Sequence, residues 1–139
     1  MSDLNGYLKT SFDKRVLFDT GVVVDYLMGD KRAQAFYAEF VFTGQLTPVL
    51  SAQSVCELFM AVRNKKEDGD LAQWLLSVFD IANVDYKIGK LAGLLKRGAK
   101  ITSSDLIIAS TASILKIPLV TTNPAPYRKA DIRIFAPYT

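Results

Sequence analysis

The sequence lacks histidine entirely and contains a single cysteine, Cys56, among its 139 residues. Without histidine, the chain has neither the usual zinc ligand nor the usual general base, and Ser-His and Cys-His catalytic pairs are excluded. One cysteine excludes an internal disulfide and a thiolate metal cluster. We expect Cys56 to be a small apolar core residue on a helix. Any chemistry must therefore use carboxylates, hydroxyls, lysines or a metal ion.

Long apolar runs are also missing. Residues 1–15 lack the apolar core of a signal peptide, and no later stretch is long enough to cross a membrane. We therefore expect a cytoplasmic protein with no membrane partner. Hydrophobic residues make up 50% of the chain, which predicts a folded protein. The length suits one domain over residues 16–139, preceded by an N-terminal extension over 1–15.

Short, wholly apolar runs alternate with amphipathic segments along the chain. Such runs are typical of strands in a parallel sheet, because helices cover both faces of the sheet. We predict strands at 16–18, 48–50, 81–84, 118–120 and 131–135. Predicted helices cover 22–28, 30–40, 52–64, 70–79, 86–97 and 102–115. The pattern predicts a three-layer α/β/α sandwich with a mainly parallel central sheet of about five strands.

Three acidic residues occupy notable positions in this pattern. Asp19 directly follows the first apolar strand, where open α/β sheets bind ligands, although a helix-capping role is an equal alternative. Glu57 lies beside the predicted core stripe of the helix 52–64, where a solvated edge residue is the usual interpretation. Asp105 opens the apolar helix 102–115, either as a capping-box acid with Thr102 or as an acid that needs a nearby cation.

The core stripe of the helix 52–64 is predicted from residues that recur at intervals of three and four. It consists of Val55, Leu58, Phe59 and Val62.

Three carboxylates brought together would repel one another unless a divalent cation lay between them. Hard oxygen ligands of this kind favour Mg²⁺ or Mn²⁺. The formal net charge is +3, and setting the three acids apart leaves +6 on the rest of the chain. A basic surface around an acidic pocket favours a polyanionic substrate, although such an excess of Lys and Arg is more often a matter of solubility.

At this point the sequence resembles the PIN-domain family, and in particular its small VapC-like toxin branch. The residues 17–20 (LFDT), 54–58 (SVCEL) and 104–112 (SDLIIASTA) are similar to the segments that carry the family's acids. The residues 119–123 (LVTTN) are similar to the strand that closes its site. The resemblance covers nearly all of residues 16–135.

The resemblance implies a Mg²⁺- or Mn²⁺-dependent endoribonuclease that acts on RNA, usually as a homodimer, and that is often neutralised by a small antitoxin protein. It assigns catalysis and metal binding to Asp19, Glu57 and Asp105. Thr20, Thr121 and Asn123 would support the site. Candidate phosphate-binding residues around the pocket are Arg63, Lys65, Lys66, Arg97, Lys100 and Arg128.

Two positions depart from the family pattern. Gly21 stands where the family usually has asparagine or serine, and Pro126 stands where an acid commonly precedes an aromatic residue. These departures keep open a catalytically impaired PIN scaffold that binds RNA or protein. A phosphatase that works through an aspartyl-phosphate on Asp19 is a further alternative. It is disfavoured because phosphatases of the haloacid-dehalogenase type need a second aspartate at the position of Gly21.

Overall fold

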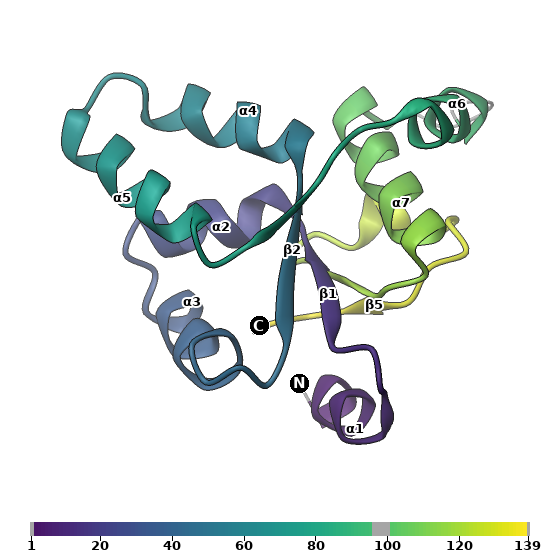
Figure 1. The fold of residues 1–139 in the computed structure, drawn as a ribbon, viewed down its shortest axis with the longest axis horizontal. Coiled ribbons are helices and arrows are strands. Elements are labelled where there is room, and N and C mark those ends of the chain that lie inside the picture. Colours follow the sequence, from purple (N-terminus) through teal and green to yellow (C-terminus); the bar gives the residue numbers. More distant parts are fainter. Residues whose placement is uncertain (1, 96–100, 139) are drawn as a thin grey trace.

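The computed structural model describes residues 2–95 and 101–138. Its centre is a parallel sheet of five strands in the order β3-β2-β1-β4-β5 (Figure 1). The strands are β1 (Arg15–Phe18), β2 (Thr47–Ser51), β3 (Asp80–Ala82), β4 (Leu119–Val120) and β5 (Ile134–Phe135). Helices flank the sheet on both sides in Figure 1, which confirms the predicted α/β/α sandwich.

The helices follow the predicted order along the chain. They are α1 (Ser2–Thr10), α2 (Thr20–Leu27), α3 (Lys31–Phe36), α4 (Ala52–Val62), α5 (Lys66–Leu76), α6 (Tyr86–Leu95) and α7 (Ser103–Leu115), with a π-helical turn η1 (Tyr37–Val41) and a 3-10 turn η2 (Ala125–Tyr127). Figure 1 shows α2, α3 and α5 on one side of the sheet and α6 and α7 on the other. The predicted end of the helix at 96 and 97 lies outside the described residues.

β1, β2 and β4 are apolar because each contributes side chains to two separate cores. Val16 and Phe18 of β1 pack into the core that includes α2 and α3. Leu17, between them, packs into the core that includes α7. Side chains alternate from one face of a strand to the other, so a strand covered on both faces needs apolar residues at every position. The same alternation holds in β2, where Leu50 and Val49 face opposite cores.

Side-chain caps set the start of α3 and α4. Asp30 accepts hydrogen bonds from the N–H groups of Arg32 and Ala33 at the start of α3. Ser51 accepts one from Gln53 at the start of α4. Such caps satisfy N–H groups that have no partner within the helix. Both caps were predicted from the sequence and are confirmed.

The buried face of α4 differs from the predicted stripe. Leu58 and Val62 are buried as expected, but Phe59 is 39% exposed and Ser54 is fully buried. The inward positions are thus spaced at four residues, Ser54 to Leu58 to Val62, so the helix turns Phe59 outward. The same orientation exposes Cys56, and its prediction as a core residue is wrong.

The N-terminal segment forms α1 and joins the main core. Leu4 and Leu8 are buried in the same cluster as Val16 and Phe135, and the rings of Tyr7 and Phe135 lie 5.6 Å apart. Within residues 2–95 and 101–138, no helix combines the length and the apolar character needed to cross a membrane.

The order of the strands creates a switch point beside β1. The chain proceeds from β1 outward through β2 to β3, and then returns to place β4 on the opposite side of β1. At such a point the connections leave in opposite directions, which opens a crevice outside the carboxyl ends of the two central strands. Asp19 follows β1 and Thr121 follows β4, so both residues lie at this crevice.

Candidate active site

Backbone pairing at the switch point brings the ends of β1 and β4 together. Phe18 pairs with Val120 in the parallel ladder, and the N–H of Asp19 donates to the carbonyl oxygen of Val120 at 3.0 Å. The two residues that follow the strands, Asp19 and Thr121, therefore start from neighbouring backbone positions. Their side chains meet because the strands are parallel and end in register.

The Asp19 carboxylate points across to β4. Asp19 occupies the N-cap position of α2, but its side chain makes no capping hydrogen bond. Instead, the Thr121 hydroxyl donates to Asp19 Oδ2 at 2.7 Å. Thr121 is only 1% exposed. The Asp19 side chain therefore does not cap α2, and its carboxylate is available at the crevice.

Asp105 approaches the same crevice from the start of α7. Thr102 caps this helix through a bond of 3.1 Å from the Asp105 N–H to Thr102 Oγ1. The Asp105 carboxylate accepts a hydrogen bond from the Tyr127 hydroxyl, with 3.1 Å between the two oxygens. Thr102 is therefore the cap, and the carboxylate of Asp105 faces Tyr127.

Electrostatics tie Asp19 to Asp105. Burial raises the pKa of the Asp19 carboxyl, and the charge of Asp105 raises that pKa further. Hydrogen bonds from Thr121 and Tyr127 act in the opposite direction on the pKa of Asp19. Burial also raises the pKa of the Tyr127 hydroxyl, with the charges of Asp19 and Asp105 adding to the effect. Tyr127 therefore stays protonated and serves as a donor between two acids.

Glu57 joins the site through hydroxyl groups. Glu57 Oε1 lies 2.7 Å from the donating Ser104 hydroxyl and 3.0 Å from the Thr20 hydroxyl. Thr20 Oγ1 also lies 2.8 Å from the Oγ of the buried Ser54. Since Thr20 follows Asp19 and Ser104 precedes Asp105, this network links Glu57 to the segments that carry the other two acids.

The three predicted acids are thus connected to one another in different ways. The charge of Asp105 raises the pKa of Asp19, and Tyr127 donates to Asp105, whereas Glu57 is connected through Thr20 and Ser104. In the described part of the chain, no three histidine, cysteine, aspartate or glutamate side chains are grouped as a metal-binding set.

The donor set nevertheless suits a hard cation. Mg²⁺ usually takes one or two protein carboxylates and completes its shell with water and substrate phosphate. The mutual repulsion of Asp19 and Asp105 is relieved by a positive charge between them. Asp19 and Asp105 therefore fit such an ion as direct ligands, and Glu57 fits as a residue acting through water.

The two departures from the family pattern have visible structural consequences. A Cβ atom at Gly21 would meet nothing within 4 Å, so the first turn of α2 is open at that position. Pro126 precedes Tyr127 within η2, and the Tyr127 ring is fully buried. Asn123 is exposed, and its backbone N–H donates to Thr121 Oγ1 at 3.0 Å.

The predicted phosphate-binding residues lie in different places. Arg63, Lys65 and Lys66 are exposed at the corner between α4 and α5, and Arg63 is six positions beyond Glu57 along the chain. Arg128 is exposed and follows Tyr127 directly in the sequence. Arg97 and Lys100 lie outside the described residues. Among the described residues, no ion pair joins Arg63, Lys65, Lys66 or Arg128 to the three acids.

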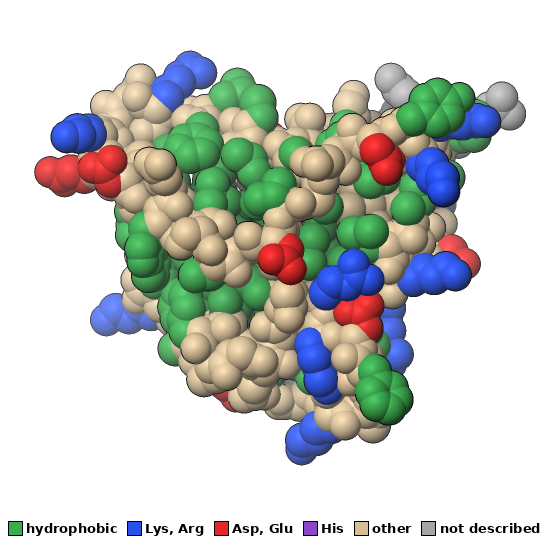
Figure 2. Space-filling model, viewed as in Figure 1, with side chains coloured by type: hydrophobic (Ala, Val, Ile, Leu, Met, Phe, Trp, Pro, Cys, Tyr) green, Lys and Arg blue, Asp and Glu red, His purple; other side chains and the backbone are tan. Residues whose placement is uncertain are grey.

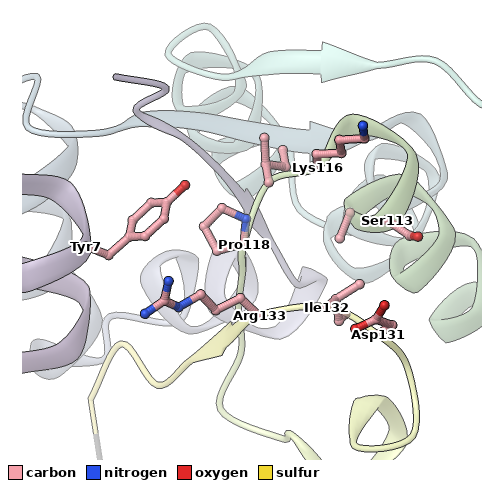
Figure 3. A pocket seen from close by; sticks show the side chains of 9 residues that line it. Tyr7, Ser113, Lys116, Pro118, Asp131, Ile132 and Arg133 are labelled. Atoms are coloured by element: carbon pink, nitrogen blue, oxygen red, sulfur yellow. The ribbon is translucent and has the colours of Figure 1, made fainter. Parts of the chain in front are cut away.

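A separate hollow of about 370 Å³ lies at the amino ends of the strands, at the end of the sheet opposite to the carboxylates (Figure 3). Lys116 and Pro118 line it just before β4, and Arg133 lines it just before β5. Tyr7 of α1 forms another part of the wall, and the Arg133 guanidinium carbon lies 5.3 Å from the centre of its ring. Because it flanks the amino ends of β4 and β5, this hollow is separate from the carboxylate site.

Sequence reasoning did not assign a role to three residues that contact the acids or their hydrogen-bond partners. Tyr127 contacts Asp105, and Ser104 and Ser54 belong to the hydrogen-bond network around Glu57 and Thr20. Both serines stand inside the motif segments. Ser54 precedes Glu57 by about one helical turn and Ser104 directly precedes Asp105, and this spacing is the signal that could have found them. Tyr127 lies 22 residues from Asp105, and only the fold brings it near.

Comparisons with known proteins agree with this geometry. The sequence model described as the PIN domain matches residues 16–132. The chain therefore belongs to the PIN-domain family. Among curated proteins, no sequence matches this chain.

Solved structures with the same fold include several toxin–antitoxin assemblies. A toxin–antitoxin complex from Klebsiella pneumoniae has a TM-score of 0.73 at 24% identity, covering 88% of this chain and 98% of that chain. FitAcB from Neisseria gonorrhoeae has a TM-score of 0.73 at 25% identity, covering 88% and 97%. DNA-bound VapBC from Salmonella typhimurium has a TM-score of 0.75 at 15% identity, covering 88% and 98%. These similarities, together with the family match, support a nuclease.

Proposed function

We propose that this protein is a Mg²⁺- or Mn²⁺-dependent endoribonuclease that hydrolyses phosphodiester bonds in RNA, and that it is the toxin of a toxin–antitoxin pair. The observation that carries the proposal is the convergence of Asp19 and Asp105 at the switch point of a PIN-domain sheet, joined through the Tyr127 hydroxyl. Two coupled carboxylates in a partly buried crevice are the arrangement that a divalent cation stabilises.

In this proposal, Asp19 and Asp105 hold the ion directly, and Glu57 holds or orients a water molecule. When bound, the ion would lower the pKa of that water and stabilise negative charge on the phosphate. Thr121 keeps the Asp19 carboxylate in place through its bond of 2.7 Å. Thr20 and Ser104 fix one oxygen of Glu57, and the other oxygen, which bonds to no other described residue, would accept a hydrogen bond from water.

RNA would be held through its phosphates. Arg128 lies nearest in sequence to the site, immediately after Tyr127. Arg63 follows the last residue of α4, on the order of 9 Å along the helix axis from Glu57 at a rise of ~1.5 Å per residue, and Lys65 and Lys66 stand at the start of α5. Each phosphate contact releases bound counterions, so binding to single-stranded RNA should weaken steeply as salt rises. Affinity that is unchanged between low and high salt would contradict this part of the proposal.

An antitoxin partner is supported by an exposed apolar surface. Figure 2 shows apolar side chains gathered over the side of the molecule formed by α2, α3 and α5. Phe42 is 45% exposed and Trp74 is 51% exposed, and their ring centres lie 6.0 Å apart. Exposed apolar surface of this kind marks interaction sites. We expect an apolar segment of the antitoxin to cover Phe42 and Trp74.

Co-expression tests this assignment. The chain would be produced together with the small protein encoded beside its gene, and co-purification would be measured for the wild type and for Trp74→Glu. We expect the substitution to abolish co-purification while the isolated protein remains folded by circular dichroism. Retention of the partner by the variant would remove this surface from the proposal. We also expect a homodimer, and a chromatographic mass equal to the 15.4 kDa monomer would refute that expectation.

Cleavage of a mixed RNA pool tests the proposed activity itself. The purified protein would be incubated with Mn²⁺ or with EDTA, and Asp105→Asn would serve as the variant that alters only one ligand. We expect cleavage that requires both the metal ion and Asp105. Mn²⁺ at one hundred times its dissociation constant should also stabilise the wild-type fold by about 2.7 kcal/mol. The same addition should have a much smaller effect on Asp105→Asn.

A catalytically impaired scaffold is the second candidate function, and Gly21 and Pro126 favour it. The open space at Gly21 means that no side chain from this position helps to hold water or metal. In such a scaffold the fold would bind RNA or protein without cleaving it. Calorimetry that detects no Mn²⁺ binding, together with intact RNA in the cleavage assay, would favour the scaffold over the nuclease.

A further inference from the structure

The Tyr127 hydroxyl is placed where packing alone does not require a polar group. Tyr127 is the last residue of η2, and its side chain is fully buried in the core that contains Leu17, Ile108 and Leu119. A phenylalanine would supply the same apolar ring. Burying a hydroxyl without a partner is costly, so the oxygen must find an acceptor. Its acceptor is Asp105 Oδ1, at 3.1 Å.

The hydroxyl acts on two carboxylates, Asp105 through a direct hydrogen bond and Asp19 through its effect on the pKa of that carboxyl. Tyr127 donates to Asp105, and it also lowers the pKa of Asp19 through a hydrogen-bond interaction. The Asp19 carboxylate already accepts from Thr121 through Oδ2. A neutral donor placed between two acids reduces their repulsion and restricts the rotation of both carboxyl groups. Carboxylates that bind metals are commonly oriented by such hydrogen bonds from neighbouring residues.

We infer that Tyr127 is a positioning residue of the candidate metal site: its hydroxyl holds Oδ1 of Asp105, and thereby directs Oδ2 of Asp105 toward a divalent cation. The inference rests on the proposed function, because it assigns the carboxylates to metal binding. It concerns the affinity for the ion and the order of the site, and it does not give Tyr127 a part in bond cleavage.

Tyr127→Phe tests the inference because it removes the hydroxyl and keeps the buried ring. The matched control is Tyr138→Phe, since the Tyr138 hydroxyl also donates to an aspartate, Asp25, at 2.7 Å but away from the crevice. Mn²⁺ binding would be measured by calorimetry for the wild type and both variants. Thermal unfolding without metal would show that each variant is folded. RNA cleavage would be followed at low and at saturating Mn²⁺.

We expect Tyr127→Phe to bind Mn²⁺ about tenfold more weakly, the lower end of the roughly 10–100-fold loss typical when a residue that orients a ligand is removed. Tyr138→Phe should bind like the wild type. Cleavage by Tyr127→Phe should recover when Mn²⁺ is saturating. A Tyr127→Phe affinity equal to that of the wild type would overturn the inference, even if the variant were less stable.

The design separates the inference from the proposed function. A wild-type protein that binds Mn²⁺ without cleaving RNA would refute the nuclease, while the affinity difference between wild type and Tyr127→Phe would still measure the role of Tyr127. A wild-type protein that binds no Mn²⁺ would overturn both. Cleavage by the wild type combined with unchanged Mn²⁺ affinity in Tyr127→Phe would overturn the inference alone.

Discussion

Thr121→Val should destabilise the protein through the loss of one hydrogen bond to a charged group. Thr121 is 1% exposed, and its hydroxyl donates to Asp19 Oδ2 at 2.7 Å. Valine has nearly the same shape, so packing is retained. A hydrogen bond to a charged partner contributes roughly 1.5–3 kcal/mol, which gives an expected loss of about 2 kcal/mol at neutral pH. For a chain of this size, the melting temperature should fall by roughly 8 °C, at about 4 °C per kcal/mol.

The control for this prediction is Thr111→Val. Thr111 is also 1% exposed, but its hydroxyl donates to the carbonyl oxygen of Ile107 within the same helix, at 2.7 Å. That carbonyl keeps its helical partner when the hydroxyl is removed, so the cost should be about 0.5 kcal/mol or less. Urea unfolding followed by circular dichroism measures both variants. Equal losses for Thr121→Val and Thr111→Val would refute the role of the Asp19 contact.

The charge on Asp19 provides a second check on the same reasoning. In an Asp19→Asn background the hydrogen bond from Thr121 becomes a neutral one, worth about 1 kcal/mol, so the coupling between the two substitutions should be about 1 kcal/mol. The bond favours the ionised carboxylate. The cost of Thr121→Val should therefore be largest above the pKa of Asp19 and should decrease as the pH falls through that raised pKa. A cost that does not change with pH would contradict the assignment.

Three further predictions concern stability. Burial raises the pKa of Asp19 above 3.8 in the folded state, so ionisation of this carboxyl destabilises the fold. Asp19→Asn should therefore raise the melting temperature at pH 7, and thermal scans should show that this gain disappears below pH 3.8. Gly21→Ala should add about 0.5–1 kcal/mol in urea unfolding, because alanine restricts the unfolded chain and its Cβ meets nothing within 4 Å; a loss of stability would show that the site does not accept a side chain. Within the described residues, the buried Ser110 hydroxyl has no hydrogen-bond partner, so Ser110→Ala should stabilise the fold by about 1 kcal/mol, and destabilisation would indicate a contact with an unseen partner such as water.

Local patterns were sufficient for the strands and for the caps. β1 and β2 were predictable because strands covered on both faces must be apolar at every position, and this requirement is visible in the sequence. The caps at Asp30, Ser51 and Thr102 were predictable because a capping side chain binds an N–H group only two or three residues away.

Features that depend on how an element is rotated were not predictable to the same degree. Cys56 and Phe59 were expected in the core, yet α4 turns both outward and buries Ser54. The hydrophobic stripe defines a face only to within about one position, since residues three and four apart both lie on it. The final rotation was set by packing against α2, α5 and the neighbouring sheet, together with the hydroxyl contact between Ser54 and Thr20.

The sequence by itself indicated the fold class and the family, which are confirmed, and it named three candidate acids, because apolar runs, caps and motif segments are local properties of the chain. Only the tertiary structure decided how those acids meet. The pairing of β1 with β4 brings Thr121 to Asp19 across 102 positions, and the turn η2 brings Tyr127 to Asp105. Such contacts depend on strand order and helix packing, so the sequence could name Thr121 as a supporting residue but not its partner, and the role of Tyr127 becomes visible only when the chain is folded.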